Sequence, residues 1–204
     1  MQILDNKNVT KKTIECGEEV LIEIKKSKFI SKAVNINSKT ELENILTEIK
    51  TKYKDATHYC YAYDVESLGK GFCDDGEPSG TSGKPILNVI EKNNLSNTLI
   101  VVIRYFGGIK LGAGPLTRAY SNSATMALKN STTKQLKKVC KISFNVSFEK
   151  TFEIYKLSLM GLFCVENNFE NYFEIVCELK NKDEVLRKIE GFNVSNIKFF
   201  EVWM

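Results

Sequence analysis

The nearly unbroken apolar run from Thr98 to Phe106 is the feature that most constrains the fold. A strand with one face in water alternates apolar and polar residues, so a run without alternation predicts a central strand buried on both faces. Four glycines follow between Gly107 and Gly114, and Pro115 suits the first turn of a helix. The chain is therefore expected to build a sheet covered on both faces, with a strand, a glycine-rich loop and a helix in succession.

The residues before this run predict further strands and helices. Alternating apolar residues predict a hairpin at 18–36 and a strand at 57–65. Ser38 begins a capping box, and the apolar spacing after it predicts a helix over about 39–53. Residues 69–85 carry five glycines and two prolines, which predicts a loop that precedes a short helix.

A new pattern begins after residue 134. Its predicted elements follow the order β-α-β-β-α-β, which is typical of a ferredoxin-like domain. They are a strand at 140–148, a helix at about 150–161, a hairpin at 163–179, a helix at 182–190 and a strand at 196–203. We therefore predict an α+β protein with two domains, residues 1–134 and residues 135–204.

Composition narrows the class of protein. With 43% apolar residues and three prolines among 204 residues, the chain has the make-up of a globular protein. No apolar stretch approaches the roughly 20 residues of a membrane-spanning helix, and the N-terminus has no apolar signal region. Six cysteines without a CxxC pair, and a single histidine, argue against a disulfide framework and a zinc site. We expect a cytoplasmic protein with reduced thiols, no membrane contact, no metal and no cofactor.

The charge of the chain is unevenly distributed. The net charge is only +4, but the segment from Lys92 to Phe148 contains no Asp or Glu. Such a segment, which carries Arg104, Lys110 and Arg118 among other bases, favours anionic partners. Alternatively, acidic residues from elsewhere neutralise these bases in the folded protein. The candidates for that role are Asp64, Glu66, Asp74, Asp75 and Glu77.

The glycine-rich loop and the helix after it form the strongest candidate site. Glycines let backbone amides approach a ligand, and a helix N-terminus offers unpaired N–H groups. A phosphate is the expected ligand, although the spacing from Gly107 to Gly112 lacks the Lys-Ser/Thr of a Walker motif. The alternative is a tight turn that only needs glycine. The candidate anion- and nucleic-acid-binding residues are Lys84, Arg104, Gly107, Gly108, Lys110, Gly112, Gly114 and Arg118.

Acidic and hydroxyl side chains gather in the loop that precedes the short helix. Three carboxylates within four residues can hold a hard cation, and the Ser, Thr and Gly that follow can bind an anion. The spacing matches no EF-hand, and a surface loop whose polar side chains cap the next helix is the plainer interpretation. The residues of this possible loop site are Asp74, Asp75, Glu77, Ser79 and Thr81.

His58 and Cys60 are two residues apart on a predicted strand, so both face the same side of the sheet. A nucleophilic pair needs a thiolate within reach of the imidazole and a third group that orients the imidazole. The sequence identifies no such group. A half-buried histidine beside a small apolar cysteine is the commoner arrangement.

The tyrosines of the same strand face the other side of the sheet. They can stack unpaired bases if that face is open to solvent. If the face is covered, they form the amphipathic inner surface of the sheet. These residues are Tyr59, Tyr61 and Tyr63.

Several long segments, in order, resemble the IMPACT family and within it the YigZ branch. They are Ser27–Ile30, His58–Tyr63, Asp74–Thr81 and Val102–Tyr120. The resemblance covers roughly residues 15–130. Residues 135–204 resemble the smaller ferredoxin-like domain of bacterial members, akin to one in translation elongation factor G. Gly114-Pro115 departs from the two glycines expected of the family.

The resemblance implies an N-terminal domain with the fold of the second domain of ribosomal protein S-five. It also implies a role linked to translation or nucleic-acid binding. Eukaryotic members regulate the translational response to starvation and use an additional N-terminal interaction domain. This chain begins almost at the shared core, so that activity is not expected of it.

We expect a non-enzymatic RNA- or ribosome-associated protein, linked to regulation of translation, whose basic glycine-rich loop binds phosphates. A protein partner at the C-terminal sheet is a further interpretation. The alternative is an enzyme that acts on a phosphorylated or nucleotide small molecule. In that enzyme Asp75 and Glu77 would hold a metal, while Arg104 and Arg118 would clamp the anion. The alternative requires a concave pocket that joins the two loops.

Overall fold

The computed structural model describes residues 10–169 and 171–204. The chain is α+β and divides into two compact units, of which the first ends at Leu136 and the second runs from Lys137 to Met204. Residues 1–9 of the expected first domain lie outside the described residues. Each unit is described by itself.

The first unit is built on an antiparallel sheet of five strands. Their order across the sheet is β2-β3-β6-β4-β5. The strands are β2 (Val20–Ile24), β3 (Ser27–Asn35), β4 (His58–Val65), β5 (Gly69–Cys73) and β6 (Thr98–Tyr105). Two further strands, β1 (Lys12–Gly17) and β7 (Ser131–Gln135), pair with each other in a separate antiparallel ladder.

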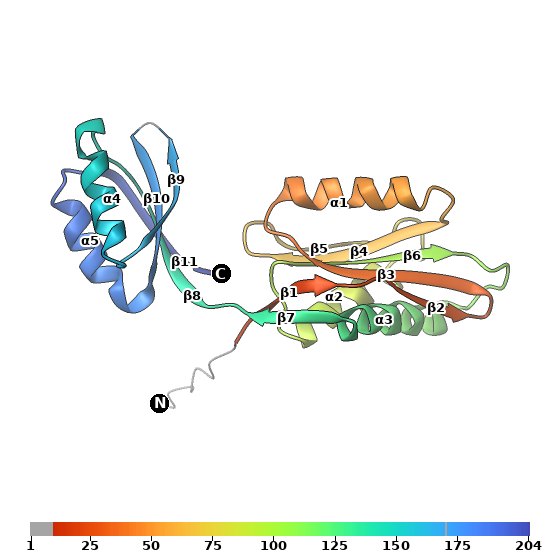
Figure 1. The fold of residues 1–204 in the computed structure, drawn as a ribbon. Coiled ribbons are helices and arrows are strands. Elements are labelled where there is room, and N and C mark those ends of the chain that lie inside the picture. Colours follow the sequence, from red (N-terminus) through yellow and green to blue (C-terminus); the bar gives the residue numbers. More distant parts are fainter. Residues whose placement is uncertain (1–9, 170) are drawn as a thin grey trace, which may run out of the picture. The chain divides into compact units, whose positions relative to one another are not determined.

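Helices cover both faces of the five-stranded sheet (Figure 1). Helix α1 (Lys39–Lys52) lies on one face, and helices α2 (Gly83–Lys92) and α3 (Ala113–Lys129) lie on the other. Central strand β6 is buried on both faces as predicted. Its odd-numbered residues 99–103 join the core beneath α1, and Ile100 and Val102 join the core beneath α2 and α3. Each buried aliphatic side chain of this kind contributes about 1.5–3 kcal/mol, so β6 anchors both layers.

Two parts of the first unit differ from the sequence expectation. Residues 69–73 form strand β5, although their glycines predicted a loop. Gly71 leaves room for an aromatic ring, because a Cβ at this position would collide with the ring and hydroxyl oxygen of Tyr63. The pair β1 and β7 was not predicted, since β7 is polar along its length and shows no apolar alternation.

Helix α3 also begins earlier than predicted. It starts at Ala113, with Gly112 as its N-cap residue, rather than at Pro115. Proline is still accommodated there, because the N–H groups of the first turn have no partner within the helix. The helix therefore opens directly from the glycine-rich loop.

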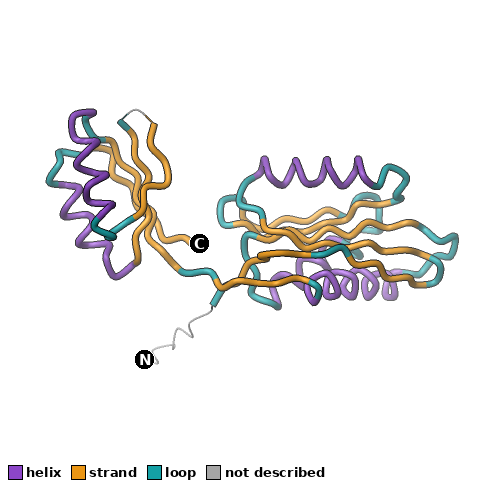
Figure 2. Tube along the Cα trace, in the orientation of Figure 1, coloured by secondary structure: helices purple, strands orange, loops and turns teal. Residues whose placement is uncertain are grey.

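The second unit has the element order βαββαβ expected from the sequence. Its elements are β8 (Lys138–Asn145), α4 (Thr151–Leu159), β9 (Cys164–Phe169), β10 (Tyr172–Glu178), α5 (Lys182–Glu190) and β11 (Ser195–Trp203). Single turns of 3₁₀ helix, Phe148–Lys150 and Leu179–Asn181, precede the two helices. The sheet order is β11-β8-β10-β9, and both helices lie on one face of it (Figure 2). Phe144 and Phe173 stack in the core between the layers, with ring centroids 5.9 Å apart.

Within the described residues, no helix combines the length and the apolar character that crossing a membrane requires.

Candidate functional site

Three neighbouring strands bring the main groups of the site together. Arg104 on β6 lies opposite His58 on β4 and opposite Phe29 on β3. Even-numbered residues of β6 face helices α2 and α3, and Cys60 and Ala62 of β4 face the same side. The side chains of His58 and Arg104 therefore meet on the α2 and α3 face, where the chain enters the glycine-rich loop.

A buried ion pair forms the centre of the site. The Arg104 guanidinium donates to Glu77 Oε1 at 2.7 Å, and the two side chains are only 5% and 4% exposed. The Tyr120 hydroxyl donates to the same oxygen at 2.7 Å. Arg104 also lies between the Phe29 and Phe106 rings, 5.4 Å from each centroid. The charge of Arg104 is thus neutralised by Glu77, one of the acids that the sequence nominated for this role.

The second oxygen of Glu77 faces the imidazole of His58. His58 Nε2 lies 3.9 Å from Glu77 Oε2. On the other side of the ring, His58 Nδ1 lies 2.8 Å from the carbonyl oxygen of Asp75. A carbonyl oxygen only accepts, so Nδ1 carries a proton and the ring is held in a fixed orientation.

Asp74 organises the loop that delivers Glu77. Its carboxylate accepts hydrogen bonds from the Ser82 hydroxyl and from the backbone N–H groups of Gly80, Ser82 and Gly83. Burial alone raises the pKa of Asp74, but these hydrogen bonds outweigh it and hold the pKa below its ordinary value. Asp74 therefore satisfies the amides that begin α2, which is the capping role expected of this loop.

The other members of the acidic loop have separate partners. Asp75 Oδ2 accepts from the backbone N–H of Tyr59 at 2.6 Å, and the Thr81 hydroxyl donates to the Pro78 carbonyl oxygen. Ser79 is exposed. The carboxylates of the loop thus point to different groups, and no cluster of three potential metal-ligating side chains occurs among the described residues.

Cys60 is a buried thiol rather than a nucleophile. Its Sγ lies 3.0 Å from the Asp74 carbonyl oxygen and 3.4 Å from the Tyr120 hydroxyl oxygen. Burial raises the pKa of the Cys60 thiol to about 12, so the reactive thiolate is not formed near neutral pH. The arrangement matches the commoner interpretation of the His58 and Cys60 pattern.

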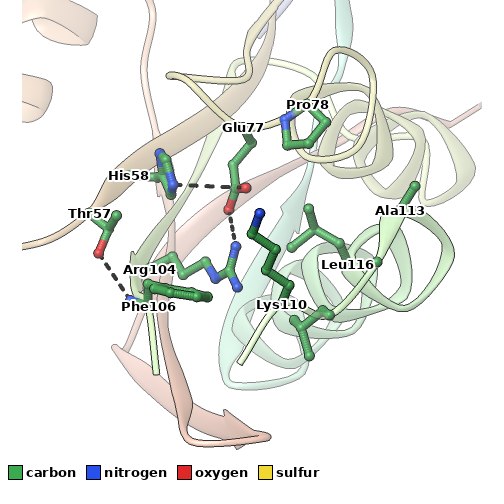
Figure 3. Close-up of a pocket in the computed structure, with 11 residues that line it drawn as sticks. Thr57, His58, Glu77, Pro78, Arg104, Phe106, Lys110, Ala113 and Leu116 are labelled. Carbon is green, nitrogen blue, oxygen red and sulfur yellow. Dashed lines mark hydrogen bonds and ion pairs between the residues drawn. The ribbon is translucent and has the colours of Figure 1, made fainter. Parts of the chain in front are cut away.

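A pocket of about 410 Å³ joins the acidic loop to the glycine-rich loop (Figure 3). His58, Glu77 and Arg104 lie at its polar end, while Phe106 and Leu116 supply apolar walls. The Lys110 side chain extends from the glycine-rich loop in the direction of Glu77 (Figure 3). A pocket between the two loops is the feature that the enzymatic alternative required.

The N-terminus of α3 borders this pocket through Gly112 and Ala113. Among the described residues no side chain forms a cap hydrogen bond there, in contrast to α2, whose first amides are bound by Asp74. Gly112 has φ of 81°, a conformation that glycine adopts without strain. The pocket thus meets a helix end whose N–H groups are open to a ligand.

Only some residues of the predicted anion site line the pocket. Gly107 is packed against the β2–β3 turn, where a Cβ would collide with the backbone of Lys26. Gly108 has φ of 80° and open space around it. Gly114 and Arg118 lie on the first turns of α3, and Lys84 lies on α2. Of the predicted set, Arg104, Lys110 and Gly112 line the pocket.

A second pocket, of about 480 Å³, lies on the other side of Phe106. It is lined by Lys26, Lys28 and Tyr105, together with Leu21 and Ile30. Phe106 belongs to both pockets and is 44% exposed. Sequence reasoning missed these residues, although Lys25-Lys26 at the expected hairpin turn was a visible signal. Neither Lys26, Lys28 nor Lys110 has a carboxylate within 4.0 Å in the part of the chain that the structure describes.

The tyrosine row lies on the opposite face of the sheet, beneath α1. Tyr59, Tyr61 and Tyr63 are half-buried and pack against the core cluster that contains Leu42 and Ile49 of α1. The Tyr59 hydroxyl donates to the Tyr53 carbonyl oxygen. These rings therefore act as inner surface of the sheet, and none of them lines either pocket.

The sheet of the second unit, where a protein partner was expected, carries an ion-pair network. Lys141 pairs with Glu166 at 2.8 Å and with Glu174 at 3.3 Å. Large exposed apolar side chains of this unit lie on and beside α4, including Phe152 and Leu159 at 68% and 88% exposure, and on strand β11, where Phe199 and Phe200 are 52% and 47% exposed.

Comparison with known proteins identifies relatives of this chain. The model of the Impact N-terminal domain matches residues 25–128. The IMPACT family member YvyE of Bacillus subtilis is 44% identical over 119 residues, which are 57% of this chain and 54% of that protein. An IMPACT family member of Thermus thermophilus is 38% identical over 134 residues, 66% of this chain and 73% of that protein.

A crystal structure of a hypothetical protein superposes with a TM-score of 0.74 at 25% identity, covering 94% of this chain and 96% of that chain. The sequence matches span little more than half the length of several curated relatives, including those of Bacillus subtilis, Haemophilus influenzae and Escherichia coli. Together the matches confirm the resemblance that the sequence segments indicated.

Proposed function

Because the chain belongs to the IMPACT family, we propose that it is a cytoplasmic protein, linked to regulation of translation, that binds single-stranded RNA on the ribosome. The family link is carried by residues 25–128, which include both loops of the site. The acid-free segment of the sequence, with its excess of bases, supports an anionic partner. The binding itself requires no chemistry on the RNA.

One observation carries this proposal: two pockets share the exposed ring of Phe106, and both are lined by lysines that have no acidic partner among the residues that the structure describes. Lys110 belongs to one pocket, and Lys26 and Lys28 belong to the other. A positively charged surface with an exposed aromatic ring is the combination that single-stranded nucleic acid needs. The lysines bind phosphates and the ring stacks on a base. The open N-terminus of α3 adds a further phosphate contact.

The test measures binding of a short single-stranded RNA, by fluorescence anisotropy, at about 50 and about 200 mM salt, with ribosome co-sedimentation beside it. Each phosphate contact in a single strand contributes about 0.7 to the slope of log affinity against log salt. The variant Lys26→Ala/Lys28→Ala/Lys110→Ala should therefore weaken binding and reduce that slope by about 2.

The matched control removes three exposed lysines that lie outside both pockets, Lys54, Lys92 and Lys129. It changes the net charge of the chain by the same amount, so a difference between the two variants reports position and not total charge. Circular dichroism confirms that both variants fold. Absence of RNA and ribosome binding at low salt, affinity that is flat with salt, or equal loss in both variants would refute the proposal.

A second candidate function is an enzyme that acts on a phosphorylated or nucleotide small molecule. The specific observation in its favour is the pocket between the two loops, with His58 and Glu77 at its polar end. The metal-dependent version of this enzyme loses its support, because Glu77 is paired with Arg104 and Asp75 with the Tyr59 amide. Arg104 lines the pocket, but its charge is already paired with that of Glu77.

This second candidate is tested by thermal shift with inorganic phosphate, sugar phosphates and nucleoside monophosphates. Any compound that raises the melting temperature is then incubated with the protein and examined for turnover by mass spectrometry. Stabilisation followed by turnover supports the enzyme. Absence of stabilisation by every compound, together with salt-dependent RNA binding, refutes it.

A further inference from the structure

The polar end of the pocket at Glu77 presents two hydrogen-bond acceptors to the same space. His58 Nδ1 is committed as a donor to the Asp75 carbonyl oxygen, so in the neutral imidazole Nε2 keeps its lone pair and accepts. Glu77 Oε1 accepts from Arg104 and Tyr120, which leaves Oε2. At 3.9 Å, Nε2 and Oε2 are too far apart for a direct hydrogen bond.

His58 Nε2 and Glu77 Oε2 face the same space, so a ligand group that donates two hydrogen bonds can satisfy both acceptors. A hydroxyl has one hydrogen and satisfies one of them, and a carbonyl oxygen would be repelled by both. An exocyclic amino group has two N–H donors that diverge from one nitrogen, so it can satisfy both. Among nucleobases, cytosine, adenine and guanine each carry such a group on the Watson–Crick edge, which is open in a single strand, and a carboxylate is a known acceptor for the cytosine amino group.

The rest of the pocket suits a flat, anionic ligand. Phe106, Pro78 and Leu116 line it with apolar surface, as a stacked base requires. Lys110 and the uncapped N-terminus of α3 border the same space and favour a phosphate. The volume of about 410 Å³ lies in the range of small-molecule pockets.

We propose that this pocket receives one amino-bearing nucleobase of the bound RNA, whose exocyclic amino group donates to His58 Nε2 and Glu77 Oε2; the homopolymers below test the proposal for cytosine and adenine. The inference rests on the RNA binding proposed above. It adds base selectivity to a contact that lysines alone would make without regard to sequence.

The first experiment compares matched homopolymers on the wild-type protein. Oligocytidine and oligouridine differ where the amino group is replaced by a carbonyl oxygen, and oligoadenosine and oligoinosine differ in the same way. The amino-bearing member of each pair should bind roughly tenfold tighter, because its partner leaves two acceptors unpaired and adds repulsion. Measurement at one fixed salt concentration keeps the phosphate contribution equal within each pair.

Two variants locate the selectivity in the two acceptors. His58→Ala removes one acceptor from a half-exposed position and should reduce the preference to about threefold. Glu77→Gln keeps one oxygen for Arg104 and Tyr120 and turns an amide N–H₂ toward His58, which should abolish the preference. Asn88→Ala is the matched control, since it removes an uncharged polar side chain on α2 outside the pocket. His58→Ala carries the test if Glu77→Gln fails to fold.

The outcomes separate this inference from the proposed function. A wild-type protein that binds RNA with steep salt dependence but equally for both members of each pair refutes the base contact and leaves RNA binding intact. Retention of the full preference in folded His58→Ala also refutes it. A protein that binds none of the four homopolymers refutes the proposed function itself. Lysine variants should change the salt slope and leave the base preference unchanged.

Discussion

Replacing Glu77 by alanine should strongly destabilise the first unit. Glu77 and Arg104 are 4% and 5% exposed, so the substitution leaves a guanidinium charge buried without its counter-charge. Removal of one partner from a buried pair typically costs about 3–5 kcal/mol. The Tyr120 hydroxyl loses its carboxylate acceptor at the same time. Because folded domains are stable by only about 5–15 kcal/mol, a large part of the stability should disappear.

Urea denaturation followed by circular dichroism measures this change, and a double-mutant cycle isolates its cause. Glu77→Leu/Arg104→Leu removes both charges and should be more stable than either Glu77→Leu or Arg104→Leu alone, since apolar replacement of a whole buried pair is often nearly neutral. The interaction energy of the cycle should reach about 2 kcal/mol or more. As a control, Glu43→Ala breaks the exposed pair with Lys39 and should cost less than about 0.5 kcal/mol.

Two results would refute the reasoning. One is a loss below about 1 kcal/mol for Glu77→Ala, which would mean that Arg104 reaches water once its partner is removed. The other is a double variant no more stable than the sum of the single losses, which would mean that the two charges do not depend on each other.

Three further predictions concern the neighbouring loops. Gly107→Ala should destabilise the unit by about 2 kcal/mol or more in urea denaturation, because its Cβ would collide with the backbone of Lys26. Gly108→Ala lies in open space and should cost only about 1–2 kcal/mol, because alanine is strained in a left-handed backbone conformation. Equal losses in the two variants would contradict the collision. Burial raises the pKa of Cys60 to about 12, so Cys60 should resist alkylation in the native protein near pH 8 while the exposed cysteines react, as measured by mass spectrometry. The buried thiol should contribute its full stability below the unfolded-state pKa near 9, and this contribution should decline as pH rises toward 12. Burial raises the pKa of Asp74, but its hydrogen bonds lower the pKa by more, so the net pKa lies below its ordinary value. Ionised Asp74 therefore contributes stability above about pH 4 that is lost as pH falls through the lowered pKa. In Asp74→Asn the free energy of unfolding should consequently depend less on pH in the acid range.

Much of the fold follows from local pattern. The unbroken apolar run at β6 predicted a strand buried on both faces, and the alternation at β4 predicted which side each residue faces. The helix after Ser38 was predicted from its cap and apolar spacing, and the order of elements after residue 134 from the same kind of evidence. Strand β5 was missed, because its Gly71 accommodates the Tyr63 ring from a neighbouring strand and the sequence alone cannot display that contact.

Only part of the site was predicted, because its other contacts also join segments that are distant in the sequence. Lys110 and Gly112 were recognised from the glycine-rich loop, and they do line the pocket. Arg104 was expected to meet a phosphate, yet it is paired with Glu77, a residue 27 positions away in the chain. Lys26 and Lys28 were not singled out, since only the pairing of β3 with β6 brings the hairpin turn beside Phe106.

The sequence by itself determined the elements that depend on near neighbours: the buried strand, the glycine-rich loop, the helix that opens from it, and the family to which those motifs belong. Periodicity, capping and turn chemistry act within a few residues and can be read from the chain. The tertiary structure decided which charges are neutralised and which face a ligand. The burial of Arg104 and the meeting of His58 with Glu77 are contacts between distant segments, and their energies exist only after the sheet has brought those segments together.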